Sequence, residues 1–165
     1  SSLEPKVRAQ VEMAQAGYRA GLPFNLDAWD GYPAARERLY QSIRRAGAHP
    51  IVLAGDSHAF WANQLADADG TAIGVEFGTS AISSPSIGDT LPQVPLGALL
   101  EKASPEVLFC DQRAKGYILL TLTPERATGD YVAMSTILEP KAQASRIKRF
   151  SLAAGATAFD KDEGS

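Results

Sequence analysis

The chain has very little cysteine and histidine. Its 165 residues include a single cysteine, Cys110, which excludes an internal disulfide and a zinc site built from several cysteines. Cys110 lies in an apolar stretch with no histidine nearby, so we predict a buried structural thiol and not a nucleophile. The chain has two histidines, His49 and His58, so any metal site must draw on carboxylates or on ligands from outside this chain.

Long apolar runs and blocks of like charge are also lacking. Without an apolar run of membrane-spanning length, no transmembrane helix is expected. Sixteen Lys and Arg against 19 Asp and Glu give a formal net charge of −3, with no basic cluster that predicts a nucleic-acid surface or a membrane anchor. The first ten residues lack the basic-then-apolar pattern of a signal peptide.

The pattern of apolar residues predicts a mixed α/β (α+β) fold. With 45% apolar residues, the composition is that of a globular protein, and the length suits one domain over residues 1–152 with a small, polar, frayed tail at 153–165. The predicted elements are two helices, then alternating strands and helices, then a run of antiparallel strands, and this order is typical of a mixed α/β layer structure. The expected helices are 4–20, 33–46, 59–66 and 92–103, and the expected strands are 51–55, 71–77, 107–110, 116–123, 129–137 and 146–152.

A polar cluster follows the first predicted strand. The run Ile51–Gly55 is apolar and β-branched, which indicates a fully buried central strand. Asp56 and His58 come directly after it, and ligands often gather at the carboxyl ends of strands. A carboxylate oxygen with an imidazole nitrogen suits iron, zinc or manganese. The alternative is that Asp56 caps the predicted helix and His58 is an ordinary polar residue, and spacing alone favours this alternative.

Two further loops carry polar or aromatic residues. Trp29 and Asp30 could line a substrate pocket. Alternatively, Asp30-Gly31 is a turn and Trp29 fills the core. The segment EFGTSAISSPS, residues 76–86, has hydroxyls and amides that could bind an anion, although a serine-rich loop is more often only a connection.

Four segments taken in order resemble the C-terminal region of PhoD-like phosphatases. They are WDGYPAARERLYQSI, PIVLAGDSHAFWANQL, VEFGTSAISSPS and DQRAKGYILLTLTPERATGDYV, and the resemblance covers roughly residues 22–152. The family is similar to calcineurin-like metallophosphoesterases, so the resemblance implies the C-terminal part of a four-layer αββα sandwich. It also implies hydrolysis of phosphate monoesters or diesters at a cluster of metal ions, with iron and calcium as the expected metals.

The resemblance assigns roles to particular residues. Asp56 and His58 match the family's late metal-site motif, which makes them the expected metal-site and catalytic residues, and Trp29 and Asp30 are expected near the mouth of the site. The family's early aspartate-rich motifs are not found here, so we expect an incomplete fragment that is inactive alone. Its expected partners are a phosphoester substrate and either the N-terminal remainder of the enzyme or a second copy. A periplasmic or secreted location is implied. The alternative function is a non-catalytic binding or assembly module that keeps the fold.

Overall fold

The computed structural model describes residues 16, 20 and 27–161. The chain divides into two compact units, residues 1–45 and 46–165, where the sequence predicts one domain. Each unit is described by itself. The helix predicted over residues 4–20 lies outside the described residues, apart from Ala16 and Ala20.

From residue 27 on, the first unit contains a short 3-10 helix and an α-helix. The 3-10 helix η1 covers Trp29–Gly31, and the helix α2 covers Pro33–Arg45, which confirms the helix predicted over 33–46. Proline suits the first turn because it lacks the N–H that would be unpaired there. Tyr40 is the buried residue of α2. Among the described residues, no helix is both long and apolar enough to cross a membrane.

The second unit begins with a four-stranded sheet, called sheet A. Its strands are β1 (Ile51–Ala54), β2 (Phe60–Ala66), β3 (Ala72–Gly78) and β4 (Val107–Asp111), in the order β1-β3-β2-β4. β1 and β3 are parallel, while β2 is antiparallel to both β3 and β4. β1, β3 and β4 therefore run in the same direction, and their carboxyl ends lie at one edge of the sheet.

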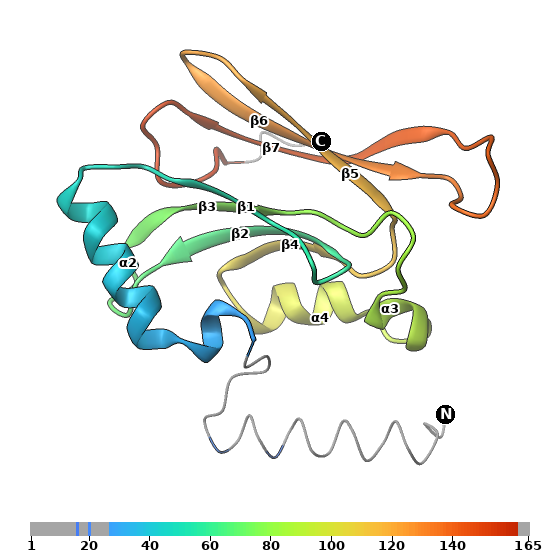
Figure 1. Cartoon of the computed structure of the whole chain (residues 1–165), viewed down its shortest axis with the longest axis horizontal. Helices are drawn as coiled ribbons and strands as arrows, with labels where there is room; N and C mark the ends of the chain where they lie inside the picture. Colours follow the sequence, from blue (N-terminus) through green and yellow to red (C-terminus); the bar gives the residue numbers. More distant parts are fainter. Residues whose placement is uncertain (1–15, 17–19, 21–26, 162–165) are drawn as a thin grey trace. The chain divides into compact units, whose positions relative to one another are not determined.

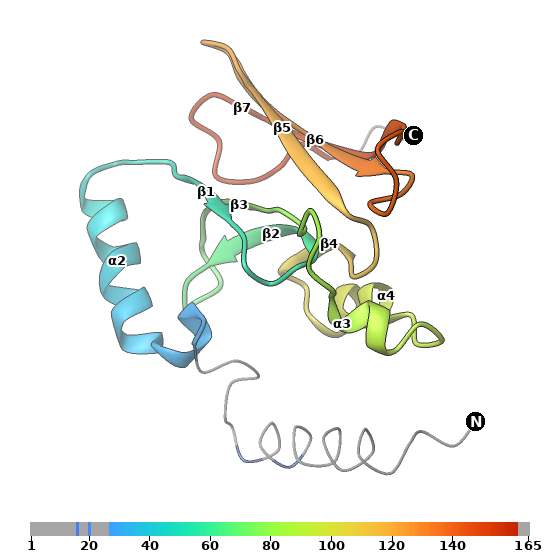
Figure 2. The same cartoon turned by 45° about the vertical axis from the view of Figure 1, so that its right-hand side comes forward.

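A second sheet, called sheet B, packs on one face of sheet A. It consists of the antiparallel strands β5 (Gly116–Leu122), β6 (Arg126–Met134) and β7 (Ala144–Ala153). The short helix α3 covers Ile87–Thr90, and α4 covers Leu96–Ala103. Figures 1 and 2 show α4 on the face of sheet A opposite sheet B. α4 lies close to β4, since a Cβ on its Gly97 would come within 2.0 Å of the Cys110 carbonyl oxygen.

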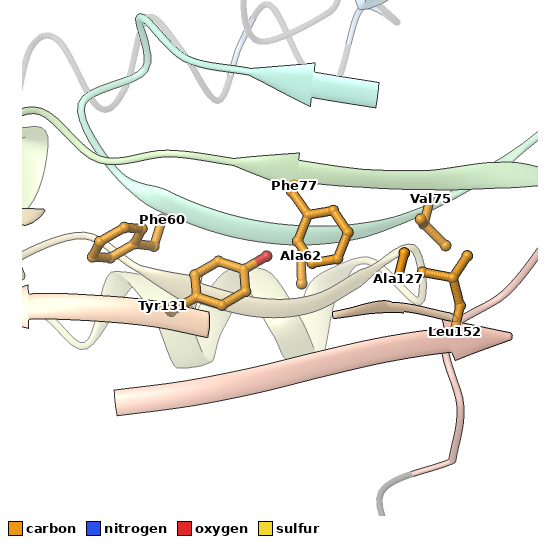
Figure 3. Packing of buried hydrophobic residues seen from close by; sticks show 7 residues of the cluster. All are labelled: Phe60, Ala62, Val75, Phe77, Ala127, Tyr131 and Leu152. Carbon is orange, nitrogen blue, oxygen red and sulfur yellow. The ribbon is translucent and has the colours of Figure 1, made fainter. Parts of the chain in front are cut away.

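The core lies between the two sheets (Figure 3). Phe60 and Phe77 come from sheet A, and Tyr131 from β6 lies between them, with ring centroids 5.6 and 6.1 Å away. The Tyr131 hydroxyl donates a hydrogen bond of 2.7 Å to the Trp61 carbonyl oxygen, so the buried polar group is satisfied. Gly129 allows the sheets to approach closely, because a Cβ there would lie 2.2 Å from the Phe77 ring. The mixed α/β class with two packed sheets is confirmed.

One predicted helix is wrong. Residues 59–66 contain good helix formers, but Phe60–Ala66 forms the strand β2, which lies between β3 and β4. Phe60 and Ala62 are two residues apart in the strand, so both side chains point to the face that packs on sheet B, where they are fully buried. Pairing on both sides and burial of this face outweigh the local helix propensity of the segment.

The central position predicted for β1 is wrong, and the tail predicted to fray over 153–165 is ordered where it is described, since residues 162–165 lie outside the described residues. In the described chain β1 is an edge strand of sheet A and not a central one, and its Leu53 is 65% exposed. An apolar run in the sequence indicates a buried segment, but it does not show which elements cover the strand or where the strand lies in the sheet. The tail folds back as far as Asp160, whose amide donates to the Ser151 carbonyl at 2.7 Å. Phe159 anchors this segment, with its ring centroid 5.1 Å from that of Phe77.

Candidate functional site

Three loops meet at the carboxyl edge of sheet A, on the right of Figure 1 beside α3. The loops follow β1, β3 and β4, and we refer to residues 55–59, 79–86 and 112–115 as the first, second and third loop. Ala54 pairs with Gly78, and Phe60 pairs with Asp111, so all three loops leave the sheet next to one another. The carboxyl edge of such a sheet is the usual place for a ligand site.

The first loop contains the sharpest backbone feature of the molecule. Asp56 has φ 65° and His58 has φ 58°, and no other non-glycine residue in the described ranges has a positive φ. The Ser57 amide donates to the Gly55 carbonyl at 2.8 Å, so Asp56 is the central residue of a strained γ-turn. Each such residue costs on the order of 1–3 kcal/mol and persists only where its surroundings hold it, most often at functional sites. The two residues that the sequence predicts as site residues are therefore the two strained ones.

Neighbouring groups fix the direction of this loop. His58 Nδ1 lies 2.8 Å from the Pro85 carbonyl oxygen of the second loop. A carbonyl can only accept, so Nδ1 carries the hydrogen in this contact and Nε2 keeps its lone pair when the ring is neutral. The Ser57 hydroxyl accepts a hydrogen bond of 2.9 Å from the Trp61 indole. The Asp56 side chain is exposed and makes no hydrogen bond within the described part of the chain.

The helix-capping alternative for Asp56 is excluded. The segment that would form the capped helix is the strand β2. An exposed carboxylate on a strained turn, with no described hydrogen bond, also gives no stabilising contact that would explain why an Asp stands there.

The hydroxyls of the second loop tie loops together. Ser80 Oγ donates a hydrogen bond of 2.6 Å to the Ala114 carbonyl, and Ser86 Oγ donates a short one to the Gln112 carbonyl. Both serines are buried, at 6% and 5% exposure, so their hydroxyls are not presented to an anion. The interpretation of residues 76–86 as a connection is therefore favoured over anion binding through these two hydroxyls.

A buried lysine links the second and third loops, and sequence reasoning missed it. Lys115 is 9% exposed, and its Nζ lies 2.8 Å from Asp89 Oδ2 and 3.1 Å from Ser86 Oγ. The Lys115 hydrogen bond is the main reason that the pKa of Asp89 is lowered to about 2. Ser86 and Asp89 also form a capping box around α3. The spacing Ser-x-x-Asp was a signal for that box.

Cys110 is buried, as predicted. Burial raises the pKa of its thiol to about 11, which keeps it protonated near neutral pH. Gln112 donates to its sulfur at 3.1 Å. A protonated, buried thiol is unsuited to nucleophilic attack.

Comparisons with known proteins show the family of the chain. The family model of PhoD-like phosphatases matches residues 5–131, which include all three loops. The chain belongs to the PhoD-like phosphatase family. Alkaline phosphatase D of Bacillus subtilis (strain 168) is 35% identical over 135 residues, which cover 78% of this chain and 22% of that protein. A solved structure of PhoD superposes with a TM-score of 0.66 at 29% identity, over 86% of this chain and 27% of that one.

This PhoD-like chain thus spans about a fifth of the length of the curated relative. The described residues contain no group of three or more His, Cys, Asp or Glu placed to hold a metal ion. Asp56 and His58 supply one carboxylate and one imidazole, a donor pair that fits a transition metal but is too small for a complete coordination shell. The other ligands of such a site must come from outside the described residues.

Trp29 and Asp30 belong to the first unit. Trp29 is 53% exposed, so it does not fill a core, and Asp30 lies in η1, where it forms an ion pair of 2.5 Å with Arg36. Their expected position at the mouth of the Asp56 and His58 site stays a prediction.

An open pocket of about 430 Å³ lies elsewhere in the second unit. It includes Gln64 of β2, Phe150 of β7 and Phe159 of the tail among its lining residues, and none of the lining residues belongs to the three loops. We therefore place the candidate site at the carboxyl edge and not in this pocket.

Proposed function

We propose that this chain is part of a metal-dependent phosphoesterase and that Asp56 and His58 contribute to its metal site. The observation that carries the proposal is the strained conformation of both residues on one loop at the carboxyl edge of sheet A. Membership of the PhoD-like phosphatase family supports the reaction class, hydrolysis of phosphate monoesters or diesters.

The donors suit the chemistry of this reaction. A bound metal ion neutralises phosphate charge and lowers the pKa of a bound water toward neutrality. Asp56 would present a carboxylate oxygen to the ion, and His58 would present Nε2, since Nδ1 is held by the Pro85 carbonyl. We propose iron and calcium as the metals, from the family resemblance, and a periplasmic or secreted location on the same ground.

The complete site needs residues that this chain does not provide in its described part. We propose that the missing ligands come from the N-terminal remainder of the same enzyme, because the chain corresponds to about a fifth of its curated relative. Self-association is the alternative source. A non-catalytic binding or assembly module that keeps the fold is the competing function.

The test is substitution in the protein that carries this chain in its natural sequence context. We expect His58→Ala and Asp56→Asn each to lower hydrolysis of p-nitrophenyl phosphate and of its bis-ester at least about 10–100-fold. Metal content measured by mass spectrometry should fall with them, while the free energy of unfolding changes by less than about 1 kcal/mol.

The matched control is His49→Ala, since His49 is the other histidine and is exposed. It should leave turnover and metal content unchanged. Full turnover and full metal content in His58→Ala would overturn the assignment. A wild-type protein with neither metal nor turnover would favour the binding module.

A further inference from the structure

The His58 ring forms a hydrogen bond with Pro85. Nδ1 lies 2.8 Å from the Pro85 carbonyl oxygen, 27 residues away in sequence. This carbonyl selects the neutral tautomer with hydrogen on Nδ1, because the opposite tautomer would set two lone pairs against each other. The position of Pro85 therefore decides which ring nitrogen is available as a ligand.

Pro85 is held in place by its neighbour Ser86. The Ser86 amide donates to Asp89 Oδ2 at 2.6 Å, and the Ser86 hydroxyl donates to the Gln112 carbonyl. Lys115 Nζ donates to both Asp89 Oδ2 and Ser86 Oγ, at 2.8 and 3.1 Å. One ammonium group thus closes the network that fixes the residue next to Pro85.

Lys115 itself is rigidly placed. Its carbonyl accepts a hydrogen bond of 2.8 Å from the Met134 amide in β6, and the amide of the following Gly116 donates to the Ala81 carbonyl at 3.3 Å. The Lys115 backbone is therefore anchored to sheet B and to the second loop, and its side chain is 9% exposed. Lysines are rarely buried to this extent unless a partner holds their charge.

The Ser86 and Lys115 pair does not form a nucleophilic dyad. Lys115 Nζ donates hydrogen bonds to Asp89 Oδ2 and to Ser86 Oγ, so in this arrangement it is a donor toward the Ser86 hydroxyl and not its proton acceptor. Ser86 is 5% exposed, and its hydroxyl donates its hydrogen to the Gln112 carbonyl. The pair is therefore suited to hold the second loop and not to attack a substrate.

We propose that Lys115 is a positioning residue for His58. Through Asp89 and Ser86 it fixes the Pro85 carbonyl against Nδ1, and so it keeps the lone pair of the neutral ring on Nε2. The link to metal binding rests on the proposed function above, whereas the control of the tautomer does not. Groups that hold the second nitrogen of a metal-binding histidine commonly affect metal affinity by 10–100-fold.

The experiment reads the tautomer directly by long-range ¹H–¹⁵N NMR of the ¹⁵N-histidine-labelled 165-residue chain. The chain has two histidines, so His58→Ala assigns the spectrum and His49 serves as the internal reference. The spectra are recorded at pH 8.5, about two units above the reference pKa of a histidine side chain. We expect wild-type His58 to be uniformly in the Nδ1–H form. Lys115→Met keeps an unbranched side chain but removes the ammonium group. This variant should convert His58 to a mixture of the two tautomers.

Two other variants make the result interpretable. Asp89→Asn removes the carboxylate of the same network, at a residue that is partly exposed and therefore tolerant of substitution. It should also give a mixture of tautomers, and it provides the test if Lys115→Met does not fold. Lys148→Met makes the same substitution on β7 and should leave His58 unchanged. A wild-type His58 in the Nε2–H form overturns the proposal. So does an unaltered Nδ1–H form in folded Lys115→Met and Asp89→Asn.

A second measurement separates this inference from the proposed function. In the protein that carries the chain in its natural context, iron and calcium retained after purification should fall at least about tenfold in Lys115→Met. If the tautomer mixes but the metal content stays full, Lys115 still positions His58, and the role of His58 as a metal ligand is wrong. If the metal content falls with the tautomer, both stand.

Discussion

At the scale of single residues, Asp56 and His58 stand out because their backbone is strained. Asp56 is exposed at φ 65°, and His58 at φ 58° uses one ring nitrogen for the Pro85 carbonyl. Asp and His tolerate the left-handed region better than most residues, but glycine adopts it without any Cβ penalty. A non-glycine residue at such a position suggests a role for its side chain that outweighs the backbone strain.

This leads to a prediction for the stability of Asp56 variants. Asp56→Gly removes the Cβ strain and should leave the free energy of unfolding unchanged or raise it by up to about 1 kcal/mol. Asp56→Ala keeps the strain and should be less stable than the glycine variant by about 1 kcal/mol. Urea unfolding of the 165-residue chain measures both. A glycine variant that is clearly less stable than wild type would show that the Asp56 side chain serves folding.

At the scale of elements, the short helix α3 depends on a charge that is not part of its own sequence. Ser86 and Asp89 form its capping box, and Lys115 from the connection between β4 and β5 completes it. α3 spans Ile87–Thr90, too short to be stable by itself, so this local element exists because a distant lysine holds it.

The capping box predicts a particular pH dependence. Mainly because of Lys115, the pKa of Asp89 is lowered from 3.8 to about 2. A lowered pKa in the folded state means that the stabilising contribution is complete above about pH 4 and is lost as the pH falls toward 2. Stability of wild type should therefore fall more steeply between pH 4 and 2 than that of Asp89→Asn, as measured by urea unfolding at each pH. Parallel curves for the two proteins would contradict this prediction.

At the scale of the whole molecule, the second unit is a packed pair of sheets with several large apolar side chains left at its surface. Tyr117 and Leu119 of β5 are 45% and 54% exposed, and Leu53 of the edge strand β1 is 65% exposed. Surface of this kind is compatible with further chain packing against the unit. The chain matches 22% of the length of the curated relative, which is also compatible with further chain packing against this unit.

The isolated chain is therefore predicted to be a poor catalyst. Two donors do not hold a metal cluster, so the purified 165-residue chain should hydrolyse p-nitrophenyl phosphate and its bis-ester only at the background rate, with or without added iron and calcium. The same assay on the protein that carries the chain in its natural context is the positive control. Turnover at an enzyme-like rate by the 165-residue chain would refute the prediction.

Local sequence was sufficient for much of this fold. Proline, glycine and apolar periodicity predicted α2, β3, α4 and the strands β4 to β7, although β6 was expected over 129–137 and spans Arg126–Met134. Each of these elements follows from interactions within one segment or across one turn. The same patterns, with the family resemblance, singled out Asp56 and His58. Contacts between distant segments decided the rest. Burial between two neighbouring strands made residues 60–66 a strand. Lys115 lies near the site because the β4–β5 connection packs against the segment that follows β3. Its partners Asp89 and Ser86 are 26 and 29 positions away in the sequence, a separation that no local pattern predicts.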